Sequence, residues 1–152
     1  MLMGIVVLGA FGMLGTSLRR YFDANFQEYT QFSRDDLDVC DSNQISSCLD
    51  QISSLSYIIN CTGYTDVDGA ETHSDLAFKI NGDAVGYLAD YCQKRGVRLV
   101  HFSTDYVFDG TKTFGYVESD LVAPLSVYGH SKLKGEQFIQ STMEDFLIFR
   151  LQ

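Results

Sequence analysis

A tyrosine and a lysine four residues apart, Tyr128 and Lys132, are the clearest candidates for acid–base chemistry in the chain. On a helix, side chains at positions i and i+4 share one face, so the ammonium would lie beside the phenol. A neighbouring cation favours the phenolate and moves its pKa from about 10 toward the working pH. We therefore expect Tyr128 to exchange a proton with a substrate and Lys132 to support it and to hold ribose hydroxyls.

A hydroxyl pair, Ser103-Thr104, precedes this motif at the carboxyl end of a strand predicted at 97–102. Ligands of open α/β sheets bind at the carboxyl ends of the strands, where a hydroxyl can hydrogen-bond a substrate carbonyl. The tyrosine–lysine spacing alone often arises by chance. Its combination with this hydroxyl pair favours the catalytic interpretation.

A glycine pattern near the start, Gly9, Gly12 and Gly15, predicts a dinucleotide-binding turn. The first glycine permits the tight turn, the second lets a pyrophosphate approach the backbone, and the third lets helix and strand pack closely. An ordinary glycine-rich turn is the alternative. The pattern lies between an apolar run at 3–8 and a helical stripe at 14–22, which is the context that the dinucleotide interpretation requires.

The second predicted strand ends in Ser33 and Arg34, where NAD-binding folds commonly carry an acid for the adenosine ribose. Serine leaves room for a 2′-phosphate, and Arg34 could pair with that phosphate. The alternative is that Arg34 is a solvated surface residue.

The elements that would position these residues alternate between strands and helices. Strands are predicted at 3–8, 28–32, 57–59, 97–102 and 146–149. Helices are predicted at 14–22, at 42–52 with Asp41 or Ser42 as the cap, from 74 to a stop at Gly96, and at 127–143. This alternation predicts an α/β fold, a Rossmann-type doubly wound parallel sheet with helices on both faces.

Composition narrows the class of protein. The chain has 152 residues, about one domain, and a net charge of −9, which argues against a nucleic-acid binder. Four cysteines lie far apart without a metal-binding spacing, so we expect reduced thiols, no metal site and a cytoplasmic protein. The apolar start is broken by glycines and has no charged leader, so we expect neither a signal peptide nor a membrane span.

Other titratable residues have structural interpretations. His101 lies within a predicted strand and is expected to be a structural histidine, and His130 is expected on the outer face of its helix. Asp66, Asp68 and Glu71 resemble a metal cluster, but they precede a predicted helix and are expected to cap it.

Four segments resemble the dTDP-4-dehydrorhamnose reductase family of extended short-chain dehydrogenases. They read NCTGYTDVDGAE at 60–71, FKINGDAVGYLADYC at 78–92, LVHFSTDYVFDGTK at 99–112 and YGHSKLKGE at 128–136. The resemblance extends over most of the chain, from Ile5 to Ile139. Relatives of this family include the regulatory beta subunits of methionine adenosyltransferase.

The resemblance implies the reduction of dTDP-4-dehydro-L-rhamnose to dTDP-L-rhamnose, a precursor of cell-surface polysaccharide, by NADPH or NADH. Tyr128, Lys132 and Thr104 would form the catalytic triad, with Tyr128 protonating the C4 oxygen as hydride arrives. Thr104 and Asp105 would touch the sugar. The cofactor contacts that the resemblance implies are Gly12, Met13 and Leu14 at the pyrophosphate, Asp38 and Val39 at the adenine, and Gly63, Tyr64, Thr65, Phe102, Tyr128 and Lys132 along the remainder of the cofactor. The glycine pattern and the end of the second strand add Gly9, Gly15, Ser33 and Arg34 to the expected cofactor-binding residues.

Two departures from the family qualify these expectations. Ser33 stands where many members carry an acid, which puts a strict NADH preference in doubt. The chain also stops after the strand at 146–149, so residues 1–152 are expected to be the NAD(P)-binding domain of a truncated reductase whose C-terminal substrate region, with any Mg²⁺ site, is absent. By itself this fragment is expected to bind dinucleotide weakly and to show no reductase activity.

Two further functions fit the same residues. One is an NAD-dependent sugar-nucleotide epimerase or dehydratase, which would recycle its cofactor. The other is a regulatory subunit that binds dinucleotide without turnover, like the methionine adenosyltransferase beta subunit. The expected partner is a nucleotide-sugar substrate, with no nucleic acid and no membrane, and a homodimer is one of the alternatives for the assembly.

Overall fold

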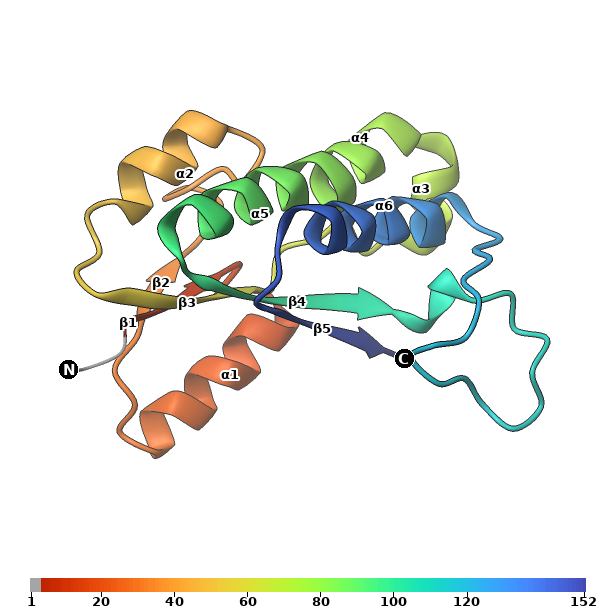
Figure 1. Cartoon of the computed structure of the whole chain (residues 1–152), viewed down its shortest axis with the longest axis horizontal. Helices are drawn as coiled ribbons and strands as arrows, with labels where there is room; N and C mark the ends of the chain where they lie inside the picture. The colour runs from red at the N-terminus through yellow and green to blue at the C-terminus, as the bar shows by residue number, and fades with distance from the viewer. Residues whose placement is uncertain (1–3) are drawn as a thin grey trace.

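The computed structural model describes residues 4–152 and contains one five-stranded sheet in the order β2-β1-β3-β4-β5 (Figure 1). The strands are β1 (Gly4–Leu8), β2 (Thr30–Phe32), β3 (Leu55–Asn60), β4 (Arg98–Thr104) and β5 (Phe146–Leu151). All neighbouring pairs are parallel, which confirms the predicted α/β fold with a parallel sheet. Met3, the first residue of the predicted strand 3–8, lies outside the described residues.

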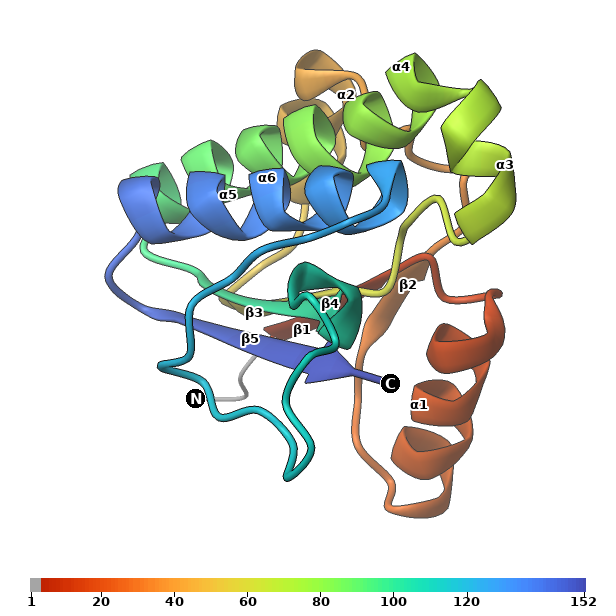
Figure 2. The same cartoon turned by 90° about the vertical axis from the view of Figure 1, so that its right-hand side faces the viewer.

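Helices lie on both faces of this sheet, as predicted. They are α1 (Met13–Ala24), α2 (Ser42–Leu49), α3 (Val67–Thr72), α4 (Ser74–Phe78), α5 (Ala84–Arg95) and α6 (Val127–Thr142). Figures 1 and 2 show α1 on one face and α2, α5 and α6 on the other. The chain leaves β1 toward β2 and later returns past β1 to β3, so the direction of winding reverses between β1 and β3. Ligands of doubly wound sheets bind at the carboxyl ends of such strands.

The main core lies between the sheet and the helices α2, α5 and α6. Its fully buried side chains include Val6, Leu8, Ile45, Leu49, Ile58, Leu88, Leu99 and Ile139. The alternate residues of β5, Leu147, Phe149 and Leu151, point to the other face and are 43–46% exposed. Within residues 4–152, no helix is long and apolar enough to cross a membrane.

The predicted helix from 74 to Gly96 is interrupted. A single π-helical turn, η1 (Lys79–Asp83), separates α4 from α5, and it contains the buried Asn81. Such turns often mark functional positions, because the extra residue redirects side chains. The end of the helix is as predicted, since Gly96 has a left-handed conformation with φ of 65°.

The acidic residues after β3 precede α4, as predicted, but they belong to the short helix α3, which was not expected. Asp66 caps α3, since its side chain accepts a hydrogen bond from the Gly69 amide. Asp68 lies in the first turn of α3, and Glu71 lies in its later part. Asp41 caps α2 as expected, because its side chain accepts from the amides of Asn43 and Gln44.

Candidate active site

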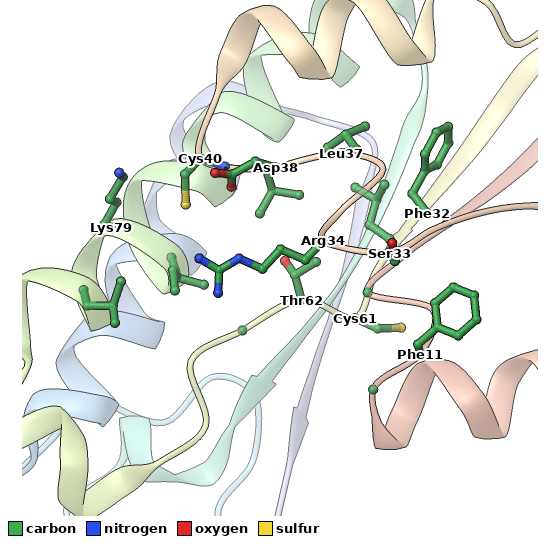
Figure 3. A pocket seen from close by; sticks show the side chains of 17 residues that line it. Phe11, Phe32, Ser33, Arg34, Leu37, Asp38, Cys40, Cys61, Thr62 and Lys79 are labelled. Atoms are coloured by element: carbon green, nitrogen blue, oxygen red, sulfur yellow. Dashed lines mark hydrogen bonds between the residues drawn. The ribbon is translucent and has the colours of Figure 1, made fainter.

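A pocket of about 370 Å³ opens where the winding of the sheet reverses (Figure 3). Its walls come from the turn after β1, the segment after β2, the end of β3 and the region around η1. Of the predicted cofactor residues, it brings together Gly9, Gly12, Ser33, Arg34, Asp38, Val39 and Gly63. Their convergence from three separate segments, after β1, β2 and β3, makes this pocket the candidate dinucleotide site.

Glycine is required or favoured for a different structural reason at each of the three positions in the turn. Gly9 has a φ of +68°, and a Cβ there would lie 2.9 Å from the Cys61 backbone. A Cβ on Gly15 would lie 2.3 Å from the Gly9 carbonyl oxygen, so this glycine permits the packing of α1 on the turn. Gly12 has space, with the nearest atom at 3.5 Å. It lines the pocket, which is where a ligand would approach the backbone.

The first turn of α1 presents backbone rather than side chains to the site. Gly12 is the N-cap and no side chain caps the helix, so the first amides of α1 have no side-chain partner. Met13 and Leu14 belong to this turn but do not line the pocket, and the Met13 side chain is 91% exposed. Any contact from these two residues to a cofactor would therefore involve their backbone amides, which suit a pyrophosphate.

The end of β2 carries a nearby acid that the sequence reasoning missed. Both the amide and the hydroxyl of Ser33 donate to the Asp36 carboxylate, at 2.8 and 2.6 Å. These hydrogen bonds hold the pKa of Asp36 below its ordinary value. Asp36 is turned toward Ser33 and does not line the pocket, whereas Arg34 does.

Arg34 and Asp38 lie on the wall formed by the segment after β2. Figure 3 shows the Arg34 side chain extending across the pocket above Thr62. Among residues 4–152, the ion pairs do not include Arg34. The Asp38 carboxylate accepts a hydrogen bond from the Cys40 amide at 2.9 Å. Lys79 of η1 adds a second cation to this pocket. The sequence did not indicate this role, because the helix predicted from 74 to Gly96 contains no π turn.

Tyr128 lies in the first turn of α6, where two caps fix the helix. The Ser126 hydroxyl accepts from the Gly129 amide at 3.0 Å, and the Glu71 carboxylate of α3 accepts from the Val127 amide at 2.9 Å. The Tyr106 ring packs edge-on against the Tyr128 ring, with centroids 5.6 Å apart. Neighbouring elements therefore hold the phenol in place.

The electrostatics of Tyr128 differ from the prediction. Burial raises the pKa of the Tyr128 phenol, and a hydrogen bond with Thr104 offsets this only in part. The Lys132 ammonium donates to the Phe102 carbonyl oxygen at 2.5 Å. The expected lowering of the phenol pKa by the lysine is therefore not present in this arrangement, because the ammonium is bound by the end of β4.

The Thr104 hydroxyl lies beside the Tyr128 phenol, at the end of β4. This hydroxyl donates to the Asp105 carboxylate at 3.2 Å and accepts from the Tyr106 amide at 3.2 Å. Thr104 is 5% exposed. A buried hydroxyl next to a phenol is a suitable donor for a substrate carbonyl.

Asn81 links the dinucleotide pocket to α6, and the sequence reasoning missed it. Its amide oxygen accepts from the Tyr64 amide at 2.8 Å, and its nitrogen donates to the Tyr64 carbonyl at 2.9 Å and to the Ser131 hydroxyl at 3.0 Å. The Tyr64 backbone is thus fixed, but Tyr64 and Thr65 do not line the pocket, whereas Gly63 does. One indication of this role was present in the sequence, since Asn81 is a polar residue among the apolar positions between 76 and 84.

The remaining candidates have structural surroundings. Phe102 stacks on Phe149 with centroids 5.7 Å apart and does not line the pocket. His101 is fully buried beside Asn60, and burial lowers its pKa well below the ordinary value. His130 is exposed on α6. Within the described residues, no group of His, Cys, Asp and Glu side chains is arranged to hold a metal ion.

The buried lysine predicts a measurable pH dependence of stability. Burial lowers the pKa of Lys132 to about 8, from an ordinary value of 10.5. Between these values the unfolded chain binds more protons, so the native chain becomes more stable as the pH rises. From pH 8 to 9, the unfolding free energy should rise by about 1 kcal/mol relative to Lys132→Met.

Urea unfolding of both proteins at several pH values checks this prediction. Burial also raises the pKa of the Cys61 and Cys92 thiols to about 12, which lowers stability above their ordinary value of 9. Both proteins share this effect, so their difference isolates the lysine. Parallel pH profiles would show that Lys132 titrates normally.

Comparison with known proteins gives concordant matches. The family model described as RmlD substrate binding domain matches residues 3–152. A dTDP-4-dehydrorhamnose reductase of Burkholderia thailandensis is 38% identical over 148 residues, which are 97% of this chain and 49% of that protein. A probable low-salt glycan biosynthesis reductase of Haloferax volcanii is 43% identical over 115 residues, 76% of this chain and 38% of that protein.

A solved structure is similar over the whole length of the chain. The crystal structure of dTDP-4-dehydrorhamnose reductase from Bacillus anthracis in complex with NADP matches with a TM-score of 0.94 and 35% identity. The match covers 99% of this chain and 53% of that one. The chain thus spans about half the length of most of the curated relatives it matches.

Proposed function

The chain belongs to the RmlD substrate binding domain family, and on this premise we propose that it binds NADPH or NADH for the reduction of a dTDP-4-keto sugar. The proposed reaction converts dTDP-4-dehydro-L-rhamnose to dTDP-L-rhamnose. Relatives that bear the name dTDP-4-dehydrorhamnose reductase support it. In this proposal, residues 1–152 supply the cofactor site and the proton donor.

One observation carries the proposal: the glycine-turn pocket lies at the same edge of the sheet as the buried Thr104 and Lys132 and the half-buried Tyr128. The residues present fit a dinucleotide, since Gly12 leaves the backbone open and the α1 amides have no side-chain cap. When bound, the nicotinamide would supply the hydride. In this proposal Lys132, whose ammonium donates to the Phe102 carbonyl oxygen at the end of β4, would also bind the hydroxyls of the nicotinamide ribose.

The Tyr128 phenol would be the proton donor. A phenol with an ordinary pKa of about 10 is protonated at neutral pH, and burial, which raises this pKa further, keeps the proton on Tyr128 until the carbonyl oxygen gains charge and accepts it. The Thr104 hydroxyl would donate to the same oxygen and hold the carbonyl in place. Asp105, which accepts from Thr104, would bind a sugar hydroxyl.

Net consumption of NADPH tests the reaction class. A reductase oxidises one NADPH for each sugar reduced, so absorbance at 340 nm should fall in proportion to the sugar converted. Conversion of the sugar without net loss of NADPH would contradict reduction and indicate an epimerase. Tight dinucleotide binding without any conversion would instead indicate a regulatory subunit.

For the cofactor, we expect NADPH to bind at least as tightly as NADH. Arg34 lines the pocket without an ion-pair partner among the described residues, and an arginine–phosphate pair is a strong charge-assisted contact. Arg34→Leu should weaken NADPH binding about tenfold and leave NADH binding nearly unchanged. Calorimetric titration of both cofactors measures this, with Arg20→Leu on the exposed side of α1 as the control. A tenfold preference of the native chain for NADH would refute it.

A further inference from the structure

A buried ion pair lies close to the candidate active site, and neither of its residues has a role assigned in the proposed chemistry. Glu136 on α6 is fully buried, and Arg150 on β5 approaches it with Nε at 3.0 Å and Nη2 at 2.7 Å. Removing a carboxylate from water is costly, and a protein in which apolar residues replace a buried ion pair is often as stable as the original protein. Stability alone therefore does not explain this pair.

The rest of the Arg150 guanidinium contacts the long connection between β4 and α6. Its Nη1 donates to the Glu118 carbonyl oxygen at 3.4 Å, and its Cζ lies 5.0 Å from the centre of the Phe108 ring. Phe108 in turn stacks on Tyr116, with centroids 4.1 Å apart and the planes within 8°. One side chain thus joins α6 and β5 to the segment 108–118.

Internal hydrogen bonds hold this segment together. The Tyr116 hydroxyl donates to the Asp109 carboxylate at 2.6 Å and accepts from the Lys112 amide at 3.2 Å. The segment leaves the end of β4 and passes β5 before the chain enters α6 (Figure 2). Fixing Phe108 and residue 118 therefore fixes both ends of the segment.

The segment forms one wall of a second cavity, of about 330 Å³, lined by Asp105, Tyr106, Phe108, Asp109, Tyr116 and Leu125 among others. Asp105 and Tyr106 directly follow Thr104, and the Tyr106 ring contacts the Tyr128 ring. The cavity therefore adjoins the proton donor. It shares no lining residue with the dinucleotide pocket, so changes in the two can be measured separately.

We propose that Arg150 and Glu136 are positioning residues that hold the 108–118 wall against the Tyr128 site and thereby determine how firmly the sugar end of the substrate is held. The inference rests on the proposed function for the identity of that substrate. The order of the wall, however, can be tested without any substrate. Arginine is required because a lysine cannot reach two carboxylate oxygens, a carbonyl and an aromatic ring at once.

The test compares Arg150→Lys with the native chain by amide hydrogen exchange. The lysine keeps a charge beside Glu136 but loses the two-pronged contact and the stacking on Phe108. Amides of 108–118 should then exchange at least about tenfold faster, while those of β1 and β3 and the Kd for NADPH change by less than about twofold. The control is Arg95→Lys, which alters the exposed Arg95–Asp50 pair and should leave this segment unchanged.

A second variant protects the test against misfolding. Arg150→Met combined with Glu136→Met removes both charges, so no unpaired carboxylate remains in the core. It should show the same rapid exchange of 108–118, and in turnover it should raise KM for the sugar nucleotide about tenfold without a matching rise in KM for NADPH.

Native-like exchange of 108–118 in both variants would overturn the positioning role. An equal acceleration across the whole sheet would also overturn it, because the pair would then serve only global stability. A chain that binds no dinucleotide would contradict the proposed function, but the exchange comparison would still decide the role of the pair.

Discussion

Replacement of Tyr128 by phenylalanine in the full-length protein should lower kcat for the 4-keto sugar by about 10²–10⁴-fold, the range expected for the loss of a general acid. The phenol proton is removed, while the ring that packs against Tyr106 is retained. Dinucleotide affinity should change by less than about twofold, because the ribose-binding role falls to Lys132. Steady-state kinetics together with a fluorescence titration of NADPH measures both quantities.

Tyr87→Phe is the matched control, since it removes the hydroxyl of a tyrosine on α5 that is 40% exposed. Both its kcat and its NADPH affinity should equal those of the native chain. If Tyr128→Phe retained comparable turnover, another group would have to supply the proton, and the acid assignment would fail.

Substitution by alanine should affect different properties at two glycines of the dinucleotide turn, stability at Gly15 and dinucleotide affinity at Gly12. Gly15→Ala places a Cβ 2.3 Å from the Gly9 carbonyl oxygen and 2.7 Å from the Ala10 Cα, both of them backbone atoms. Neither neighbour can move without displacing β1 or α1, so the unfolding free energy should fall by about 1–3 kcal/mol. Chemical denaturation measures this loss.

Gly12→Ala should leave stability almost unchanged, because the nearest atom to its Cβ is 3.5 Å away and its φ of −71° suits alanine. The added methyl would instead enter the space for the pyrophosphate and weaken dinucleotide binding about tenfold or more. If both variants had the same effect on stability, or if Gly12→Ala bound NADPH normally, the assigned roles of the two glycines would be wrong.

The features that were predictable from sequence depend on local patterns. Apolar runs and helical stripes fixed the alternation of strands and helices, since each reflects burial on one or both faces of an element. The role of Gly15 in packing followed from the turn geometry that surrounds it. The cap at Asp41 followed from the preference of short polar side chains for helix N-termini.

The features that were missed depend on contacts between distant segments. The π turn at Asn81 is stabilised by Tyr64 and Ser131, which are 17 and 50 residues away in sequence. The i, i+4 spacing placed Lys132 beside Tyr128, but its ammonium binds a carbonyl of β4, 30 residues away. Sequence periodicity describes one element at a time and carries no information about such partners.

Arg150 illustrates the same limit at the end of the chain. In sequence it is a charged residue that follows an apolar run, as at the end of many strands. Its partner Glu136 belongs to a helix with Tyr128 and Lys132, and the fold places that helix over β4 and β5. Only the three-dimensional arrangement shows that the two charges meet in the interior.

Transfer of deuterium from the cofactor tests the central claim most directly. The full-length protein is incubated with NADPH that carries deuterium at the transferable C4 position and with dTDP-4-dehydro-L-rhamnose, and the sugar product is examined by mass spectrometry and NMR. We expect one deuterium at C4 of the sugar for each NADPH oxidised, and a rate of transfer about 10²–10⁴-fold lower in Tyr128→Phe. A converted sugar without deuterium, or transfer by Tyr128→Phe at the native rate, would contradict the proposed reduction.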